Sequence, residues 1–330
     1  MTIASRLAIA SALLSITLPA FALDTSRADV SAFIDEMVAE HDYDREVLVN
    51  ALREAKTRQT ILDAISRPAE RTLNWTEYRK IFLTEERINA GVDFWREHEA
   101  TLRTISEQTG VSCEMLVGII GVETYFGRIT GNYRVLDALS TLAFDYPPRS
   151  KFFRKELAQF LLLVREEGME AATPTGSYAG AMGAPQFMPS SFRAYAVDSS
   201  DDGRRDIWSN WTDVIGSVAN YFVEHGWRRD AEVVAHASLA SDWTGQTPQN
   251  SLKLVETVAS LSQSGVMFAT EQDADARASL LLLEGVDGPE YWVGFHNFFV
   301  ITRYNRSVMY ALAAHQLGAE IAMAVRRNEQ

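Results

Sequence analysis

Cysteine is almost missing from this sequence: Cys113 is the only one among 330 residues. A single cysteine excludes an intramolecular disulfide, so the fold must rest on a hydrophobic core rather than on cross-links. The six histidines are scattered along the chain, and none stands beside Cys113 as a base. We therefore expect Cys113 to be a small buried side chain and not a nucleophile.

Positive charge is also in short supply, because 31 lysines and arginines against 44 aspartates and glutamates give a net charge of −13. A nucleic-acid partner requires a basic face, so this balance argues against nucleic-acid binding. Hydrophobic residues make up 47% of the chain and charged residues 23%, as in ordinary soluble globular proteins. The length allows one large domain or two to three smaller ones.

Several catalytic motifs are absent as well. The sequence has no helix with paired metal-binding histidines, no Gly-x-Ser-x-Gly elbow, no phosphate loop and no dinucleotide fingerprint. Ser177 lies in a Gly-Ser-Tyr sequence without a matched histidine, which disfavours a serine hydrolase. We find no internal repeat and no low-complexity segment.

The N-terminus has the pattern of a secretory signal peptide over residues 1–22. Arg6 precedes an apolar stretch, residues 8–18, and the small-x-small sequence Ala20-Phe21-Ala22 follows. The apolar part is too short to span a bilayer comfortably, although an uncleaved N-terminal anchor is the alternative. No cysteine lies near the cleavage point, so a lipoprotein anchor is excluded. We expect an exported, soluble mature protein without a stable membrane anchor.

The hydrophobic pattern predicts a mainly α (α+β) fold. Residues 23–73 repeat apolar residues at three- and four-residue spacings, which predicts an N-terminal helical region. Further helical patterns occur in the core, residues 74–230, and in residues 296–330, which complete it. Residues 231–295 instead have short apolar runs, at 252–258, 265–269 and 279–284, between Gly, Asp, Ser and Gln clusters. They predict a small antiparallel β subdomain.

Within the core, capping residues place the helices more closely. Thr84 and the acidic residues after it predict a helix that runs to about Gln108 and stops at Gly110. Residues 128–150 are expected to be loose, because Gly131-Asn132 and Pro147-Pro148 break them. We expect the next helices at 150–167 and 212–227.

One apolar segment, residues 116–127, ends on a carboxylate. Read as a helix, it places Leu116, Ile119 and Ile120 on the same stripe as Glu123. An isolated buried charge is costly, so this carboxyl group must be paired, protonated or directed into a cleft.

Two interpretations of Glu123 follow. In the first, it is a core residue that pairs with Arg128. In the second, it is a general acid whose pKa is raised by apolar surroundings, as in lysozyme. Gly118 and Gly121 each lower helix stability by roughly 1 kcal/mol relative to alanine, which indicates that another element packs very close to this helix.

Two irregular segments follow the core helices. Residues 173–192 are rich in glycine, proline and small side chains but also contain aromatic residues, which favours a loop lining a cleft over a plain surface loop. Residues 198–204 begin like an EF-hand calcium loop, although the twelfth position is Ser209 and not glutamate. A solvated acidic turn is the alternative. The expected calcium ligands are Asp198, Ser200, Asp202, the backbone carbonyl of Arg204, and Asp213.

Several segments together resemble one family. GIIGVETYFGRITGN, LDALSTLAFDYPPR, GSYAGAMGAPQFMPSSFRAYAVD, IGSVANYF and TRYN occur in the order found in the lytic murein transglycosylase B family. The similarity runs from about Trp75 to the C-terminus. It implies a goose-lysozyme-like helical catalytic core and cleavage of the β-1,4 bond between N-acetylmuramic acid and N-acetylglucosamine in periplasmic peptidoglycan. It also suggests cell-wall synthesis or division proteins as partners.

The resemblance also assigns site residues. The catalytic acid of the family falls on Glu123. The family often has two arginines after its Tyr-Pro, whereas this chain has only Arg149 after Pro148. The stretch from the calcium loop to Asp213 is one residue longer than usual. The substrate-binding positions are Tyr78, Arg149, Ser177, Gln186, Tyr221, Tyr304, Asn305 and Tyr310.

The implied mechanism needs one carboxyl group, whereas a glycosidase normally uses two. Glu123 donates a proton to the leaving glycosidic oxygen, and the N-acetyl carbonyl of the muramic acid stabilises the developing oxocarbenium ion. Glu123 then accepts the proton of the C6 hydroxyl, whose oxygen closes on C1 to give a 1,6-anhydro end. No water is consumed, so the enzyme is a lyase that needs no cofactor. A hydrolytic muramidase and a non-catalytic peptidoglycan-binding scaffold are the rival hypotheses.

Overall fold

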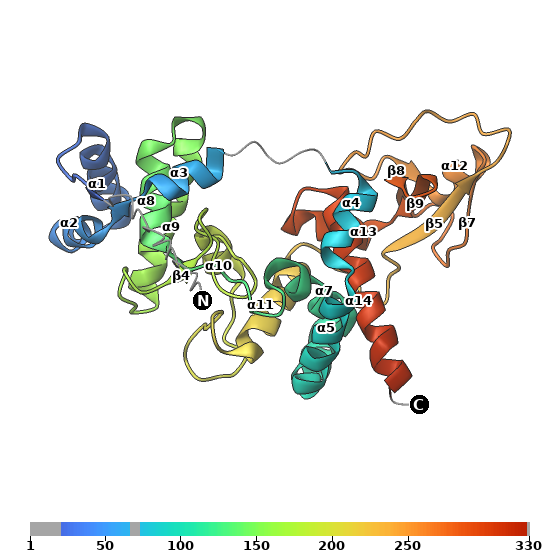
Figure 1. Cartoon of the computed structure of the whole chain (residues 1–330), viewed down its shortest axis with the longest axis horizontal. Helices are drawn as coiled ribbons and strands as arrows, with labels where there is room; N and C mark the ends of the chain where they lie inside the picture. Colours follow the sequence, from blue (N-terminus) through green and yellow to red (C-terminus); the bar gives the residue numbers. More distant parts are fainter. Residues whose placement is uncertain (1–20, 67–72, 329–330) are drawn as a thin grey trace, which may run out of the picture.

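The computed structural model describes residues 21–66 and 73–328. Most of the predicted signal peptide therefore lies outside the described residues. The chain forms a helical body with a small sheet at one end, and the N-terminal helices lie at the opposite end (Figure 1). The mainly α fold with a small antiparallel sheet is confirmed.

The N-terminal region is helical, as its apolar spacing predicts. The first helix buries Val30, Phe33, Ile34 and Met37 in the core. Two short strands, which the sequence did not indicate, pair antiparallel, and the first of them consists of the last two residues of the predicted signal peptide, Phe21 and Ala22. The elements are β1 (Phe21–Ala22), α1 (Ala28–His41), α2 (Arg45–Glu54), β2 (Lys56–Thr57) and α3 (Gln59–Ser66).

Three helices then lead toward the apolar segment. The Thr84 side chain accepts a hydrogen bond from the Arg87 N–H and caps the second of them, as predicted. The single helix expected from Thr84 to Gln108 is wrong, because the chain breaks at His98 into two helices. Gly110 ends the later one in the left-handed conformation. The elements are α4 (Trp75–Phe82), α5 (Glu85–Glu97) and α6 (Glu99–Thr109).

The next helices form the centre of the molecule. The expectation that residues 128–150 are loose is wrong, because residues 135–145 form a helix in which every residue from Val135 to Phe144 is buried. The following helix agrees with the prediction for residues 150–167. The elements are α7 (Cys113–Thr124), β3 (Tyr133–Arg134), α8 (Val135–Asp145), η1 (Pro147–Arg149) and α9 (Ser150–Glu166).

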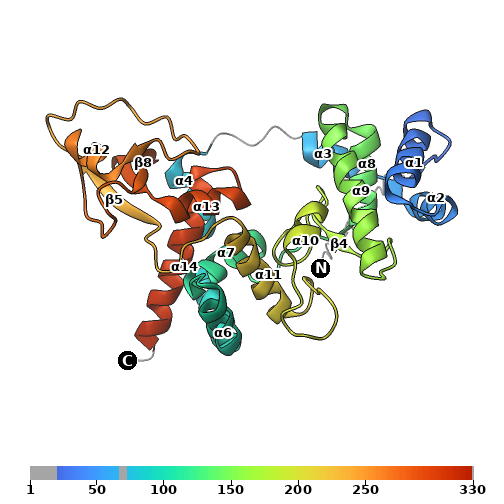
Figure 2. The same cartoon turned by 180° about the vertical axis from the view of Figure 1, so that it is seen from behind.

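The glycine-rich loop is largely irregular, as expected, and ends in a short helix that begins at Pro189. The Glu156 carboxylate accepts hydrogen bonds from the Ser190 N–H and hydroxyl, which ties this short helix to α9. A longer helix follows the predicted calcium loop (Figure 2). The elements are β4 (Thr175–Gly176), α10 (Pro189–Tyr195) and α11 (Trp211–Glu224).

Residues 234–294 form a five-stranded antiparallel sheet with the order β6-β8-β9-β5-β7. The runs at 265–269 and 279–284 are strands, as predicted. The run at 252–258 is not, because only its end pairs before a helix begins at Val258. The elements are β5 (Val234–Leu239), β6 (Glu256–Thr257), α12 (Val258–Gln263), β7 (Val266–Phe268), β8 (Arg277–Gly285) and β9 (Gly288–Gly294).

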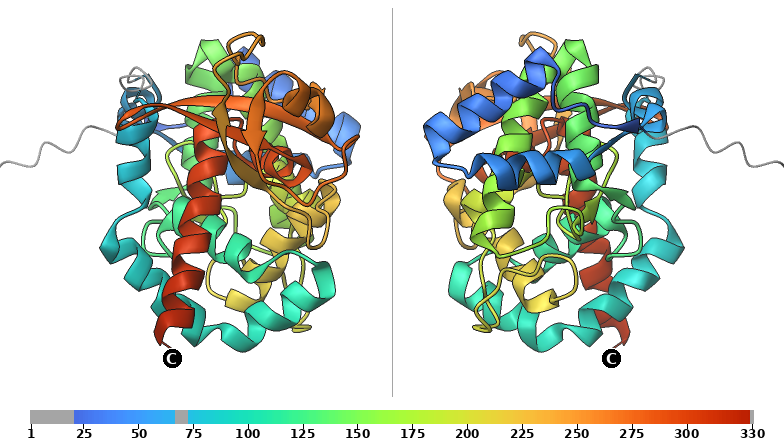
Figure 3. Two further views of the ribbon diagram at one scale, coloured as in Figure 1. Left: turned by 90° about the vertical axis from the view of Figure 1, so that its right-hand side faces the viewer. Right: turned by 90° about the vertical axis from the view of Figure 1, so that its left-hand side faces the viewer.

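Two helices, α13 (His296–Tyr304) and α14 (Val308–Asn328), return the chain to the core. The long α14 lies along α7 and α5 (Figure 3). A Cβ added at Gly118 would lie 2.3 Å from the Ala314 carbonyl oxygen, and one at Gly318 would lie 2.1 Å from the Glu114 carbonyl oxygen. The predicted close packing against α7 is therefore confirmed at Gly118. Within the described residues, α14 alone has the length and hydropathy of a membrane span, but 61% of that window is buried inside the protein.

A buried carboxylate joins the N-terminal region to α8. Asp137 has no exposed surface and pairs with Arg58 at 2.8 Å and with Arg134 at 2.5 Å. It also accepts a hydrogen bond from the Lys56 N–H at 2.9 Å. Since Arg134 belongs to β3, which pairs with β4 just before Ser177, this cluster also supports the glycine-rich loop.

Replacing Asp137 with alanine is expected to lower the free energy of unfolding by about 3–5 kcal/mol, because two arginines and one N–H lose a buried partner together. Denaturant titration measures the loss. Glu99→Ala is the control, since it breaks the exposed Glu99–Arg103 pair and should cost below about 0.5 kcal/mol. Equal losses in the two variants would contradict a special role for Asp137.

Candidate active site

Glu123 lies in the last turn of α7, a helix that Ser112 caps by accepting a hydrogen bond from the Met115 N–H. Leu116, Ile119 and Ile120 on the same stripe are fully buried. Glu123 keeps partial exposure, but the protein surrounds its carboxyl group closely and this burial raises its pKa from 4.5 to about 7. A group with this pKa is available both as an acid and as a base near neutral pH.

One tyrosine holds this carboxyl group. The Tyr310 hydroxyl on α14 donates a hydrogen bond to Glu123 Oε1 at 2.5 Å. The bond favours the ionised form and opposes part of the rise in the pKa of Glu123 that burial causes. Burial also raises the pKa of Tyr310 well above its usual value, so Tyr310 stays a neutral donor.

Two more of the predicted tyrosines lie near the same carboxyl group. Burial and the charge of Glu123 raise the pKa of Tyr78 on α4 and that of Tyr304 at the end of α13. The Tyr304 hydroxyl donates to the Pro185 carbonyl at 2.8 Å, which ties α13 to the glycine-rich loop. Tyr221 packs against Tyr304 with ring centroids 4.7 Å apart, and its hydroxyl donates to the Arg303 carbonyl. Tyr221 therefore braces Tyr304 rather than presenting a free hydroxyl.

The glycine-rich loop brings Ser177 and Gln186 into a folded turn. The Ser177 Oγ accepts a hydrogen bond from the Ala181 N–H at 3.1 Å, which leaves its own proton to donate. Gln186 has a left-handed backbone, and its Nε2 donates to the carbonyls of Thr130 and Gly183. It joins this loop to the segment after α7, and only its amide oxygen is left for a ligand.

Arg149 and Asn305 are less closely tied to Glu123. Arg149 is exposed, and its guanidinium lies 4.6 Å from the Phe152 ring centroid. Asn305 is exposed directly after Tyr304. In the part of the chain that the structure describes, no hydrogen bond, ion pair or ring contact joins Arg149 or Asn305 to Glu123.

The pairing of Glu123 with Arg128 is wrong. The Arg128 guanidinium instead lies 5.0 Å from the centroid of the Tyr125 ring. Thr124, which the sequence did not single out, donates its hydroxyl to the Ala184 carbonyl at 2.9 Å and accepts from the Gly127 N–H. It fixes the helix end to the glycine-rich loop, and its only signal in the sequence is its position beside Glu123.

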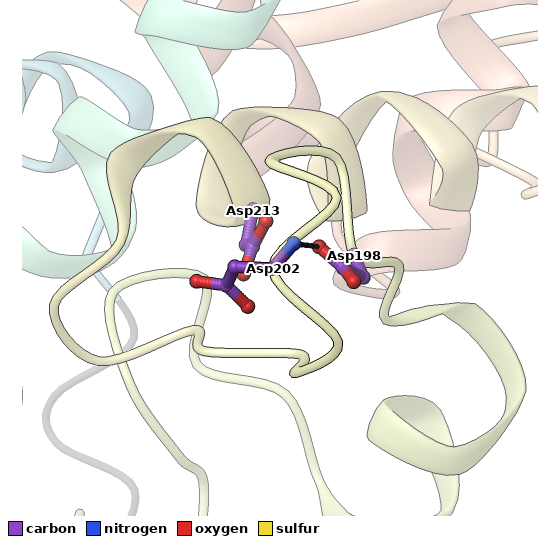
Figure 4. Close-up of side chains that lie close together, drawn as sticks. All are labelled: Asp198, Asp202 and Asp213. Atoms are coloured by element: carbon purple, nitrogen blue, oxygen red, sulfur yellow. Dashed lines mark hydrogen bonds between the residues drawn. The ribbon is translucent and has the colours of Figure 1, made fainter.

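The predicted calcium loop brings three carboxylates together. Each of Asp198, Asp202 and Asp213 offers an oxygen within 4.8 Å of the others, and Figure 4 shows the three side chains gathered at the start of α11. The Ser200 hydroxyl donates to Asp198 at 3.3 Å. Arg204 is exposed, and its N–H donates to Asp202. An all-oxygen set with this charge suits a hard cation such as Ca²⁺.

The loop is also held by its own backbone. The buried Asp213 carboxylate accepts hydrogen bonds from the N–H groups of Ser199, Ser200 and Asp206. Two residues that the sequence analysis missed support the loop. Asp206 accepts from the Trp208 and Ser209 N–H groups, and the Asn210 amide donates to Ser200. The indication of these two residues in the sequence was their position between Gly203 and α11, where side chains commonly cap a loop.

Comparison with known proteins gives a consistent result. Residues 25–319 match the family model described as "Transglycosylase SLT domain". The chain is 42% identical to membrane-bound lytic murein transglycosylase B of Escherichia coli, over 88% of this chain and 82% of that protein. It is also similar to two solved structures. Catenated lytic transglycosylase SltB1 from Pseudomonas aeruginosa is 50% identical over 90% of this chain and 98% of that one, with a TM-score of 0.87. Escherichia coli Slt35 in complex with calcium is 40% identical over 93% of this chain and 96% of that one, with a TM-score of 0.83.

Proposed function

The chain belongs to the transglycosylase SLT domain family of peptidoglycan-cleaving lyases, and from this premise we propose that Glu123 is the single acid and base of its reaction. Lytic murein transglycosylase activity on peptidoglycan is the function of the chain. The observation that carries the assignment of Glu123 is its closely surrounded carboxyl group, with a pKa of about 7, held by Tyr310.

In the proposed first step, protonated Glu123 donates its proton to the glycosidic oxygen between N-acetylmuramic acid and N-acetylglucosamine as the C1–O bond breaks. The N-acetyl carbonyl of the same muramic acid stabilises the positive charge at C1. Ionised Glu123 then removes the proton of the C6 hydroxyl, and the C6 oxygen bonds to C1. Glu123 ends the cycle protonated, and a 1,6-anhydro end replaces the glycosidic bond.

The surroundings of Glu123 support this use of one carboxyl group. Among the described residues, burial and the Tyr310 hydroxyl are the influences that shift its pKa, and no second carboxylate contributes. An inverting or retaining hydrolase would place a second carboxyl group roughly 5–9.5 Å away. A groove that binds the glycan strand is proposed to be shaped by Tyr78, Ser177, Gln186, Tyr221, Tyr304 and Asn305. Arg149 is proposed to contact the glycan strand farther from Glu123.

The products of digested sacculi test the proposal. Mass spectrometry should find anhydro-ended muropeptides, whereas free reducing ends would favour the hydrolytic muramidase. A chain that binds sacculi but releases no fragments would favour the scaffold. The same digestion can compare peptide-bearing with naked glycan strands.

The proposed location is the periplasm, with a cleaved signal peptide and no lipid anchor. The support is the pattern of residues 1–22, which lacks a cysteine at the cleavage point. Cell fractionation should recover the processed protein in the soluble periplasmic fraction, and a signal in the membrane fraction would contradict the proposal.

We also propose a structural Ca²⁺ held by Asp198, Ser200, Asp202, the Arg204 carbonyl and Asp213, with no part in the chemistry. EDTA is expected to lower the melting temperature by roughly 5–10 °C, because a ligand at 100 times its Kd stabilises the folded state by about 2.7 kcal/mol. Added Ca²⁺ should restore it. The Asp202→Asn variant should respond to neither. Identical melting curves of the wild-type chain with EDTA and with Ca²⁺ would show a metal-free loop.

A further inference from the structure

After α7, the helix that carries Glu123, the chain continues through three consecutive residues with a left-handed backbone conformation. Tyr125, Phe126 and Gly127 have φ values of 52°, 58° and 79°. Glycine adopts such angles without steric cost, but large aromatic residues do not. The two aromatic residues, which begin two positions after Glu123, must therefore be held in place by their surroundings.

Phe126 is held by the core. Its buried ring stacks on Phe94 with centroids 5.4 Å apart. It fills space that two glycines leave open: a Cβ added at Gly91 or Gly121 would lie 2.9 or 2.8 Å from its Cζ atom. Gly121 also leaves room for α14, because a Cβ at this position would lie 2.9 Å from the Cδ2 atom of Leu317.

Tyr125 is held by two arginines. Its ring centroid lies 4.6 Å from the Arg87 guanidinium and 5.0 Å from that of Arg128. Arg87 also donates a hydrogen bond to the Gly121 carbonyl at 2.8 Å, and the Tyr125 N–H bonds to the same oxygen at 3.2 Å. Arg87 thus contacts both the end of α7 and the first residue that leaves it.

Arg87 also contacts the helix that carries Tyr78. Its guanidinium lies 5.2 Å from the Phe82 ring centroid, and Phe82 packs on Tyr78 with centroids 5.2 Å apart. Within the described residues no carboxylate forms an ion pair with Arg87. The Arg87 side chain instead contacts the Gly121 carbonyl and the Tyr125 ring at the end of α7, and the Phe82 ring in α4.

We propose that Arg87 is a positioning residue that fixes the Glu123 end of α7 against the Tyr78 helix and so sets the position of Glu123 relative to Tyr78. The proposal rests on the proposed role of Glu123. Arg87 acts through the backbone and the aromatic rings and not through its charge on the carboxyl group, because Arg87 is not among the groups that shift the pKa of Glu123.

The Arg87→Met variant is expected to lower kcat roughly 10- to 100-fold, since a displacement of about 1 Å at a reacting group has an effect of this size. KM should change less than about twofold. Arg87→Lys should recover part of the loss, because an ammonium group can donate to the Gly121 carbonyl and stack on one ring. Arg96→Met is the matched control on α5, since Arg96 is exposed and should leave kcat unchanged.

The pH profile separates positioning from charge. A loosened turn admits water to Glu123, so the pKa should fall from about 7 toward 4.5 and the alkaline limb of kcat/KM should move to lower pH. A move to higher pH would mean that Arg87 acts as a charge and would overturn the proposal. An unchanged kcat with an unchanged profile would overturn it as well.

A second variant covers the case in which Arg87→Met does not fold. Tyr125→Gly removes the ring between the arginines but suits the left-handed backbone, so kcat should fall while the melting temperature changes little. Full activity of this variant would overturn the proposal. Glu123→Gln tests the proposed function separately: if it is inactive while Arg87→Met and Tyr125→Gly are fully active, only the positioning role fails.

Discussion

Glu123→Gln should lower kcat for release of muropeptides roughly 10³- to 10⁴-fold, because general acid and base catalysis contributes about 10²–10⁴ and, in the proposed mechanism, one side chain supplies both steps. Glutamine keeps the shape of the side chain and accepts the Tyr310 hydrogen bond, but it cannot donate or remove a proton in the reaction. Turbidity loss of purified sacculi measures the rate. The melting temperature should stay close to that of the wild-type chain.

Glu114→Gln is the matched control for this variant. Glu114 lies at the opposite end of α7, where it forms an exposed ion pair with Arg326 at 3.2 Å. Exposed pairs of this kind contribute little, so lysis should continue at the wild-type rate. Undiminished lysis by Glu123→Gln would exclude Glu123 from the chemistry and refute the proposed mechanism.

The pH dependence of kcat/KM of the wild-type chain also tests the proposed role of Glu123. The proposed mechanism begins with protonated Glu123, and burial raises the pKa of this group to about 7. The active fraction of the free enzyme is therefore complete at low pH and should decline as the pH rises through about 7. In contrast, an ordinary exposed glutamate would already be ionised at pH 6.

The second large effect is expected for Gly118→Ala, which should lower the free energy of unfolding by about 3 kcal/mol or more. The added Cβ would lie 2.3 Å from the Ala314 carbonyl, so one of two packed backbones must move. The clash outweighs the roughly 1 kcal/mol that alanine gains in helix propensity. Activity should fall too, because α7 carries Glu123 and α14 carries Tyr310. Denaturant titration and sacculus lysis measure the two effects.

Gly91→Ala is the comparison variant for Gly118→Ala. Its Cβ would also come too close to another residue, but the nearest atom is the Cδ1 of Ile321, the end of a flexible side chain. Ile321 can change its rotamer, so the loss of stability should be clearly smaller than for Gly118→Ala. If the two variants are equally stable, close backbone packing does not limit the α7–α14 contact.

Local signals in the sequence were enough to place much of the fold. The Thr84 cap, the stop at Gly110 and the apolar stripe of α7 depend on neighbouring residues and are found as predicted. The helix at residues 135–145 was missed for a physical reason. It is buried on all sides, so it has no polar face to produce a helical period, and the breakers at both ends dominated the prediction.

The active site likewise combines a residue that the sequence indicates with contacts that only the folded chain shows. Glu123 stands out in the sequence as one carboxylate on an apolar stripe, but its partner does not. Tyr310 comes from another helix, and no local pattern reports a contact across that separation. The orientation of Tyr221 was equally hidden, since only the folded chain shows its hydroxyl bound to the Arg303 carbonyl.

The contact between Glu123 and Tyr310 joins residues 187 positions apart. The chain must therefore be complete through the glycine-rich loop, the sheet and the first turn of α14 before the two side chains can meet. Until α14 has packed against α7, the carboxyl group lacks both its hydrogen-bond donor and much of the burial that raises its pKa. A chain in which α14 has not packed against α7 therefore lacks the environment of the proposed acid, and the capacity to cut the cell wall depends on that packing.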